Sequence, residues 1–144
     1  MLHSYMIYQR VLDDELMEII QGNRNKPMAD AYFNLMHMHK TYAEDSPTPE
    51  EMVKKGMMYS LYQPTMFMQY AAGEKSLEST RLETIFAEGN GMMNDGPIKT
   101  THLMKHYSLS VGDLVVNVLD NDTFVCMPQG WHQLEDTTLE LNVA

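Results

Sequence analysis

The segment 108–131, SLSVGDLVVNVLDNDTFVCMPQGW, constrains the fold of this chain more than any other stretch. A hydroxyl-rich lead-in and a tight turn at Val111-Gly112-Asp113 precede two apolar runs, which the polar turn 120–122 separates. Glycine permits backbone angles that other residues resist, and an aspartate side chain can close a turn on its own backbone. The segment therefore predicts an architectural turn that starts a small sheet, with Trp131 covering one end of the core.

The first part of the chain is mainly helical in its pattern. Alternation from His3 to Gln9 predicts a strand. Apolar spacing and capping signals then predict four helices, which run from Asp13-Asp14 to Gly22, from Pro27 to about Ala43, from Thr48 to about Leu61, and from about Thr80, capped by Ser79, to Gly89. Pro64 is expected to stop the third helix, and 65–71 alternates only weakly.

The last part of the chain has a β pattern. Strands are predicted at 114–119, 123–127 and 131–134, and 139–143 is either a last edge strand or a frayed tail. We therefore expect one α+β domain over residues 1–144. In it, a helical N-terminal half (about 1–90) packs on a small antiparallel sheet from a β-rich half (about 91–144).

Length and composition narrow the class of protein. The 144 residues suffice for one domain with a real core. No run of about 18 apolar residues exists, so no membrane span is expected. The N-terminus lacks the basic start and long apolar stretch of a secretion signal. Cys126 is the single cysteine and lies in an apolar run, which predicts an inert core thiol in a reducing cytoplasm.

No catalytic constellation can be assembled from the sequence. Ser108 follows His106 closely, but neither a nucleophile elbow nor an oxyanion motif surrounds them. His102 and His106 have the i,i+4 spacing that can bind a metal, yet no third ligand is near, and the closest carboxylates are Asp95 and Asp113. We therefore expect a non-enzymatic protein with no catalytic residues, no metal site and no cofactor.

The net charge of −10 repels nucleic acid on average, but one segment contains no acidic residue. No acid occurs from Gly96 to Gly112, and a second small basic spot lies at 24–26. Cations that track phosphates, together with rings that stack on bases, are typical of single-strand binding. The residues predicted to bind nucleic acid are Lys99, Thr101, His102, Lys105, His106, Tyr107, Arg24 and Lys26. The alternative is a solvated loop with a few lysines.

Several motifs resemble a pattern found in small proteins of phages and mobile elements. They are Leu82-Glu83, Phe86, Asn90, Ser108-Leu109-Ser110-Val111-Gly112-Asp113 with its following strand, and Gly130-Trp131. This pattern resembles YodL-like domains and covers about Leu82 to Leu134. The Ser-Val-Gly-Asp core is the specific part, and the N-terminal half has no counterpart. Size, mixed fold and the acid-free segment are also similar to the Drc-like group of phage single-stranded-DNA-binding proteins, from which no binding residue is carried over.

The resemblance implies a phage protein in the host cytoplasm that binds single-stranded DNA and assists a phage RNA polymerase in transcription. The alternative is a phage interaction module that binds a host factor, which the acidic surface and the methionine-rich helices favour. We expect no membrane partner. The 15 methionines include Met36, Met57 and Met66, and exposed stripes of this kind predict a homo-oligomer.

Overall fold

The computed structural model describes residues 2–11, 13–22, 24–37, 48–71, 77–90, 98–104, 108–128 and 130–135. In chain order, the elements are β1 (Leu2–Arg10), α1 (Asp14–Gln21), α2 (Lys26–Met36), α3 (Pro49–Met58), β2 (Tyr62–Ala71), α4 (Glu78–Gly89), β3 (Ile98–His102), β4 (Leu114–Asn117), β5 (Thr123–Met127) and β6 (Gly130–Gln133). The predicted α+β class is confirmed. No helix among these residues is long and apolar enough to cross a bilayer.

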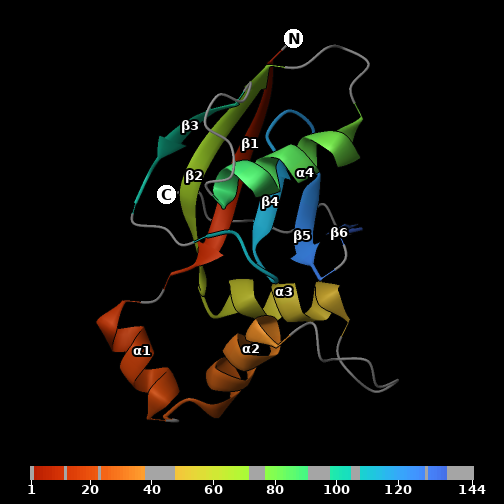
Figure 1. Cartoon of the computed structure of the whole chain (residues 1–144). Coiled ribbons are helices and arrows are strands. Elements are labelled where there is room, and N and C mark those ends of the chain that lie inside the picture. The colour runs from red at the N-terminus through yellow and green to blue at the C-terminus, as the bar shows by residue number, and fades with distance from the viewer. Residues whose placement is uncertain are drawn as a thin grey trace.

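The strands form one six-stranded antiparallel sheet in the order β3-β2-β1-β4-β5-β6. β1 is central although it is first in the chain, and it pairs with β2 on one side and β4 on the other. The sheet thus takes strands from both halves of the sequence. In Figure 1, α4 crosses one face of the sheet, whereas α1, α2 and α3 gather at one end of it.

Two apolar clusters lie on opposite faces of the sheet. Because side chains alternate along a strand, Tyr5 and Ile7 of β1 point toward α4, and Tyr8 points the other way. Tyr5 and Ile7 pack with Leu82 and Ile85 of α4. Tyr8 instead joins the cluster that α1, α2 and α3 form with the ends of β4 and β5. Cys126 is buried, as predicted, and burial raises the pKa of its thiol to about 12.

Local capping signals explain where the helices begin. The Asp13 side chain accepts a hydrogen bond from the Leu16 N–H at 2.8 Å, and Thr48 accepts one from the Glu51 N–H at 3.2 Å, as predicted. Two predicted boundaries are wrong. α2 ends at Met36 rather than near Ala43, and α4 begins after Leu77, which makes no side-chain cap, rather than after Ser79.

The strands also differ from the predicted boundaries. β2 begins at Tyr62 and includes Pro64, which lies opposite Tyr8 next to an irregularity in the β1–β2 register. The proline therefore interrupts a strand pairing and does not end a helix, which agrees with its tolerance at bulges. Segment 98–102, predicted only as an acid-free basic stretch, is the edge strand β3. The predicted element at 139–143 lies outside the described residues.

The Ser-Val-Gly-Asp motif forms a buried turn before β4. Gly112 has a φ of +94°, and a Cβ at this position would lie 2.9 Å from the Leu35 carbonyl oxygen. Tyr62 donates its hydroxyl to the Gly112 carbonyl at 2.6 Å. The Asp113 carboxylate accepts hydrogen bonds from the Ser110 N–H at 2.9 Å and from Gln9 Nε2 at 3.1 Å. These contacts tie the turn to β1, β2 and α2, so the motif has the architectural role that the sequence predicts.

Candidate nucleic-acid interface

The structure separates the two basic spots that the sequence suggests. Lys99, Thr101 and His102 lie on β3, whereas Arg24 and Lys26 lie at the connection between α1 and α2, near the other end of the molecule (Figure 1). Lys26 also forms an exposed ion pair with Asp30, with Nζ 3.6 Å from Oδ2. Arg24 and Lys26 thus form a second spot that is separate from β3, and their predicted role in nucleic-acid binding stays a prediction. The remaining predicted residues, Lys105, His106 and Tyr107, lie outside the described part of the chain.

Side chains on β3 alternate between the two faces of the sheet. Thr100 points toward α4, because its hydroxyl donates to Glu88 Oε1 at 3.2 Å. His102 follows the same parity and lies opposite Met66, whose side chain is in the cluster under α4. Lys99 and Thr101 are exposed on the other face. His102 thus does not share a face of the sheet with Lys99 and Thr101, and its predicted role in nucleic-acid binding stays a prediction.

Strand register extends the surface that Lys99 and Thr101 begin. Lys99 lies opposite Gln69, and Thr101 lies opposite Phe67. On the far side of β2, Gln69 and Phe67 lie opposite residues of β1, which in turn lead to β4. We call this surface the open sheet face, and it consists of Ser4, Met6, Phe67, Gln69, Lys99, Thr101 and Val116.

The open sheet face is most accessible along β2 and β3, whereas Met6 and Val116 are half-buried and pack against the cluster that α1, α2 and α3 form. Tyr5 and Ile7 on the α4 side of β1 are fully buried, but Met6 between them is only half-buried. Likewise, Phe67 is half-buried between the fully buried Met66 and Met68. Phe67 belongs to neither of the two apolar clusters. An aromatic ring outside both clusters, on a half-open part of the sheet, is available for contact with a ligand.

The charge of this face differs from that of the rest of the molecule. No residue of the open sheet face is acidic, and Lys99 supplies a cation at its edge. The opposite face is covered by α4, which carries Glu78, Glu83 and Glu88. In a chain with a net charge of −10, an acid-free face is the surface on which a polyanion meets the least repulsion.

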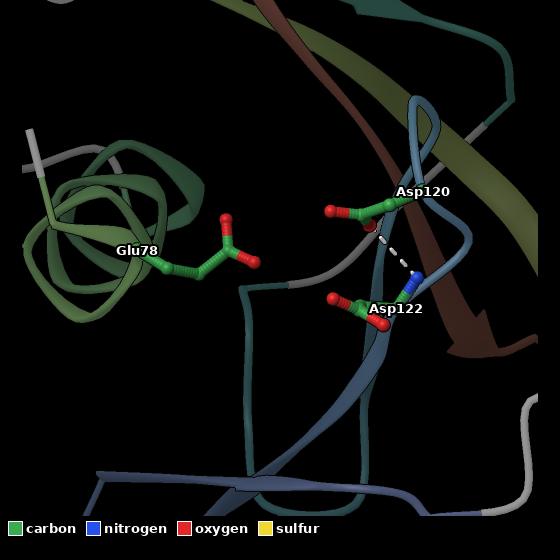
Figure 2. Close-up of side chains that lie close together, drawn as sticks. All are labelled: Glu78, Asp120 and Asp122. Atoms are coloured by element: carbon green, nitrogen blue, oxygen red, sulfur yellow. Dashed lines mark hydrogen bonds between the residues drawn. The ribbon is translucent and has the colours of Figure 1, made fainter. Parts of the chain in front are cut away.

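A second group of functional side chains lies at the N-terminal end of α4. Figure 2 shows Glu78 pointing toward Asp120 and Asp122, which come from the turn between β4 and β5. The three residues offer ligand oxygens that all lie within 4.8 Å of one another. Three carboxylates in this arrangement can coordinate a hard divalent cation. Sequence reasoning missed the group because Glu78 is brought to the turn only by the packing of α4 on the sheet.

Glu78 is also held by three hydrogen-bond donors, of which Arg81 is the one that carries a charge. Its Oε2 accepts hydrogen bonds from the Tyr5 hydroxyl at 2.7 Å, from Arg81 Nη2 at 2.8 Å and from Asn117 Nδ2 at 3.1 Å. Burial acts to raise the pKa of Glu78, but the hydrogen bonds from Tyr5 and Arg81 outweigh it, so the pKa lies below its usual value. Glu78 is therefore a structural carboxylate that links α4 to β1 and β4.

Asp122 is less well compensated. Burial raises its pKa, and the negative charges of Asp120 and Glu78 raise it further. A cavity of about 500 Å³ opens beside this group, between the N-terminal turn of α4 and the ring of Trp131 on β6. The walls of that cavity include Glu78 and Glu83, so it disfavours anions. This surface does not suit nucleic acid, unlike the open sheet face.

Comparison with other proteins assigns no family. No protein-family model, curated protein or solved structure matches this chain. The resemblance to YodL-like domains and to Drc-like proteins therefore stays a prediction from the sequence.

Proposed function

We propose that this protein binds single-stranded DNA on the open sheet face. One observation carries the proposal: register places Phe67 beside Thr101 and diagonal to Lys99 on an acid-free, half-open surface. A ring can stack on a base of any sequence, and a lysine can track the phosphate next to it. The threonine hydroxyl and the Gln69 amide add hydrogen-bond partners at the same surface.

The number of contacts sets the expected strength of binding. Stacking on an aromatic ring contributes roughly 1 to 3 kcal/mol per base, and each phosphate contact adds a salt-dependent part. Phe67 supplies one ring and Lys99 one cation among the described residues of the face. We therefore expect weak binding without sequence preference, over a few nucleotides. Such binding is appropriate for a cofactor that holds a strand while another protein acts on it.

The finer part of the proposal is that the protein is a non-enzymatic phage protein that assists a phage RNA polymerase. This part is supported by the resemblance of the motifs at 82–134 to small proteins of phages, and by the small size of the chain. In it, the open sheet face holds the exposed strand of the template, and the polymerase contacts another part of the surface.

The test is a titration of a labelled oligothymidine with the protein, followed by fluorescence anisotropy at low salt and then at rising salt. We expect saturable binding whose affinity falls as salt rises, because cations are released from the strand. Unlabelled single strands should compete better than duplex of the same length. Absence of any anisotropy change at the lowest salt concentration would contradict the proposal.

A second candidate function is protein binding, which exposed apolar side chains on α1 and α2 favour. Met17, Phe33 and Met36 are 36, 45 and 39 % exposed. The predicted methionine stripe is wrong at Met66, which is fully buried because β2 directs it toward α4. Met57 is half-buried and packs against the helical cluster.

We propose that the apolar surface of Met17, Phe33 and Met36 pairs with a second copy of the chain. Light scattering should then give a mass above that of one chain, and Phe33→Asp should lower it toward the monomer. A monomer mass for the unmodified protein at working concentration would reject self-association.

A further inference from the structure

A cavity of about 280 Å³ lies where the turn before β4 meets α1 and α2. It is lined by the polar or charged residues Gln9, Arg10, Ser108, Ser110 and Asp113 and by Met17, Tyr32 and Met36. Cavities that bind small molecules are mostly apolar and contain a few converging polar groups, with volumes from about 300 Å³ upward. This cavity is smaller and more polar than that, since five of its eight lining residues are polar or charged, so it would suit a small polar ligand.

Arg10 is the cationic group of the cavity, and Asp113 is the anionic one. The Arg10 side chain is 10 % exposed. Nη2 donates to the Val111 carbonyl at 2.7 Å and lies 3.5 Å from Asp113 Oδ1. The buried Nε has no hydrogen-bond partner within the described part of the chain. A guanidinium has five N–H donors in a planar fork. Nη2 is engaged and Nε is buried, so the two N–H groups of Nη1 are the donors of Arg10 that remain for an acceptor in the cavity.

Asp113 is the ion-pair partner of Arg10 through Oδ1, whereas its Oδ2 is committed elsewhere. Oδ2 accepts from Gln9 Nε2 at 3.1 Å and from the Ser110 N–H at 2.9 Å. Burial raises the pKa of Asp113, although Arg10 and these hydrogen bonds act to lower it. The aspartate is thus a fixed part of the turn. Its carboxylate also lines the cavity, so an anion there has to be held by the free donors of Arg10 and by nearby hydroxyls against this negative charge.

Two hydroxyls flank the guanidinium at the mouth of the cavity. Ser108 and Ser110 are both exposed and line the cavity together with Arg10. Neither hydroxyl makes a hydrogen bond to another described residue. Together with the arginine they offer donors for three separate oxygens, which is the number of terminal oxygens on a phosphate monoester and one more than on a carboxylate.

We propose that this cavity binds a small phosphate monoester with a planar body, with the phosphate at Arg10, Ser108 and Ser110 and the body against Tyr32 and Met36. The volume limits the ligand to about the size of one nucleotide. The same chemistry is present in a free nucleoside monophosphate and in the phosphorylated end of a nucleic-acid strand. The cavity is separate from the open sheet face, so this proposal and single-strand binding can fail independently. Met17 and Met36 belong both to the cavity and to the surface proposed for self-association, so ligand binding and self-association would compete.

The test is isothermal titration of the full chain with thymidine monophosphate, thymidine and inorganic phosphate. We expect the monophosphate to bind and thymidine to bind at least about tenfold more weakly, because thymidine lacks the charged group that the arginine would hold. Equal affinities for the two, or no heat from the monophosphate up to millimolar concentrations, would overturn the proposal. Competition by a 5′-phosphorylated oligothymidine, but not by its 5′-hydroxyl form, would identify the strand end as the ligand; competition by neither would identify the free nucleotide.

Variants test whether the monophosphate binds in this cavity rather than elsewhere on the protein surface. Ser108→Ala with Ser110→Ala removes two hydroxyls that have no described partner, and we expect affinity for the monophosphate to fall about tenfold. Arg10→Lys keeps the charge but loses the planar fork, and it should weaken binding similarly if it folds. Ser79→Ala, an exposed serine on α4, is the matched control, and Phe67→Ala should leave this affinity unchanged. Wild-type affinity in the serine double variant would contradict the assignment.

Discussion

Thr101 on the edge strand β3 lies directly opposite Phe67 on β2. This pairing puts a ring, a hydroxyl and, two residues back along β3, the Lys99 ammonium on one surface of the sheet. Single-strand binding needs these three kinds of group within the reach of one or two nucleotides. The pairing is therefore the structural basis of the proposed function.

Lys99→Ala should reduce the salt dependence of oligonucleotide binding. For single strands the slope of log affinity against log salt changes by about 0.7 for each phosphate that is no longer neutralised by the protein. Lys26→Ala is the matched control, because Lys26 is also exposed but lies near the α1–α2 connection and pairs with Asp30. Anisotropy titrations at several salt concentrations measure both slopes. An equal change of slope in the two variants would show that the DNA responds to the total charge of the protein and does not contact Lys99 in particular.

Gly112→Ala should destabilise the fold more than Gly130→Ala. Both glycines have positive φ, +94° and +86°, so an alanine at either position costs roughly 1 to 2 kcal/mol in backbone conformation. Only at Gly112 would the new Cβ meet a backbone atom, the Leu35 carbonyl oxygen at 2.9 Å, whereas nothing lies within 4 Å at Gly130.

Urea denaturation gives the unfolding free energy of both variants. We expect Gly112→Ala to lose about 1 kcal/mol or more beyond the loss in Gly130→Ala, because the steric cost adds to the conformational one. Equal losses would mean that the turn moves away from α2 without cost, and that the motif is not tied to the helices as described.

Glu78→Gln should make the free energy of unfolding depend less on pH at acidic pH. The pKa of Glu78 is lower in the folded state than its usual value, so this group contributes stability above its unfolded pKa, near 4.5. That contribution is lost as the pH falls through the lower, folded pKa. The glutamine of the variant cannot titrate, so the difference in unfolding free energy between wild type and variant should shrink from about pH 5 downward.

At neutral pH, Glu78→Gln should cost roughly 1 to 2 kcal/mol, because Tyr5 and Arg81 lose a charged acceptor. Glu83→Gln on the same helix is the control, since Glu83 is exposed. Thermal or urea unfolding across pH measures both. If the difference in unfolding free energy between Glu78→Gln and wild type stays constant from pH 7 to pH 3, the role assigned to Glu78 is contradicted.

Elements with a strong local signal can be predicted from the sequence. The alternation from His3 to Gln9 marks β1, and the side chains of Asp13 and Thr48 cap α1 and α3 as their types suggest. The Val111-Gly112-Asp113 turn is equally predictable, because glycine and aspartate are required there by backbone angle and hydrogen bonding.

Features that depend on pairing between distant segments cannot be predicted in this way. Phe67 and Lys99 are neighbours only through the β2–β3 register, which also sends His102 and Met66 to the opposite face. Pro64 carries a local signal for the end of a helix, but pairing with β1 places it inside a strand. Glu78 meets Asp120 and Asp122 only because α4 packs across the sheet.

The most direct test of single-strand binding at the open sheet face compares Phe67→Ala with Phe86→Ala in oligothymidine binding. Both changes remove a half-buried ring, but Phe86 lies on α4, on the opposite face of the sheet. Circular dichroism first checks that both variants are folded. Loss of stacking should weaken binding by about 5-fold to 100-fold in Phe67→Ala and leave Phe86→Ala near wild type. Wild-type affinity in a folded Phe67→Ala variant would contradict the proposal that the open sheet face binds single-stranded DNA.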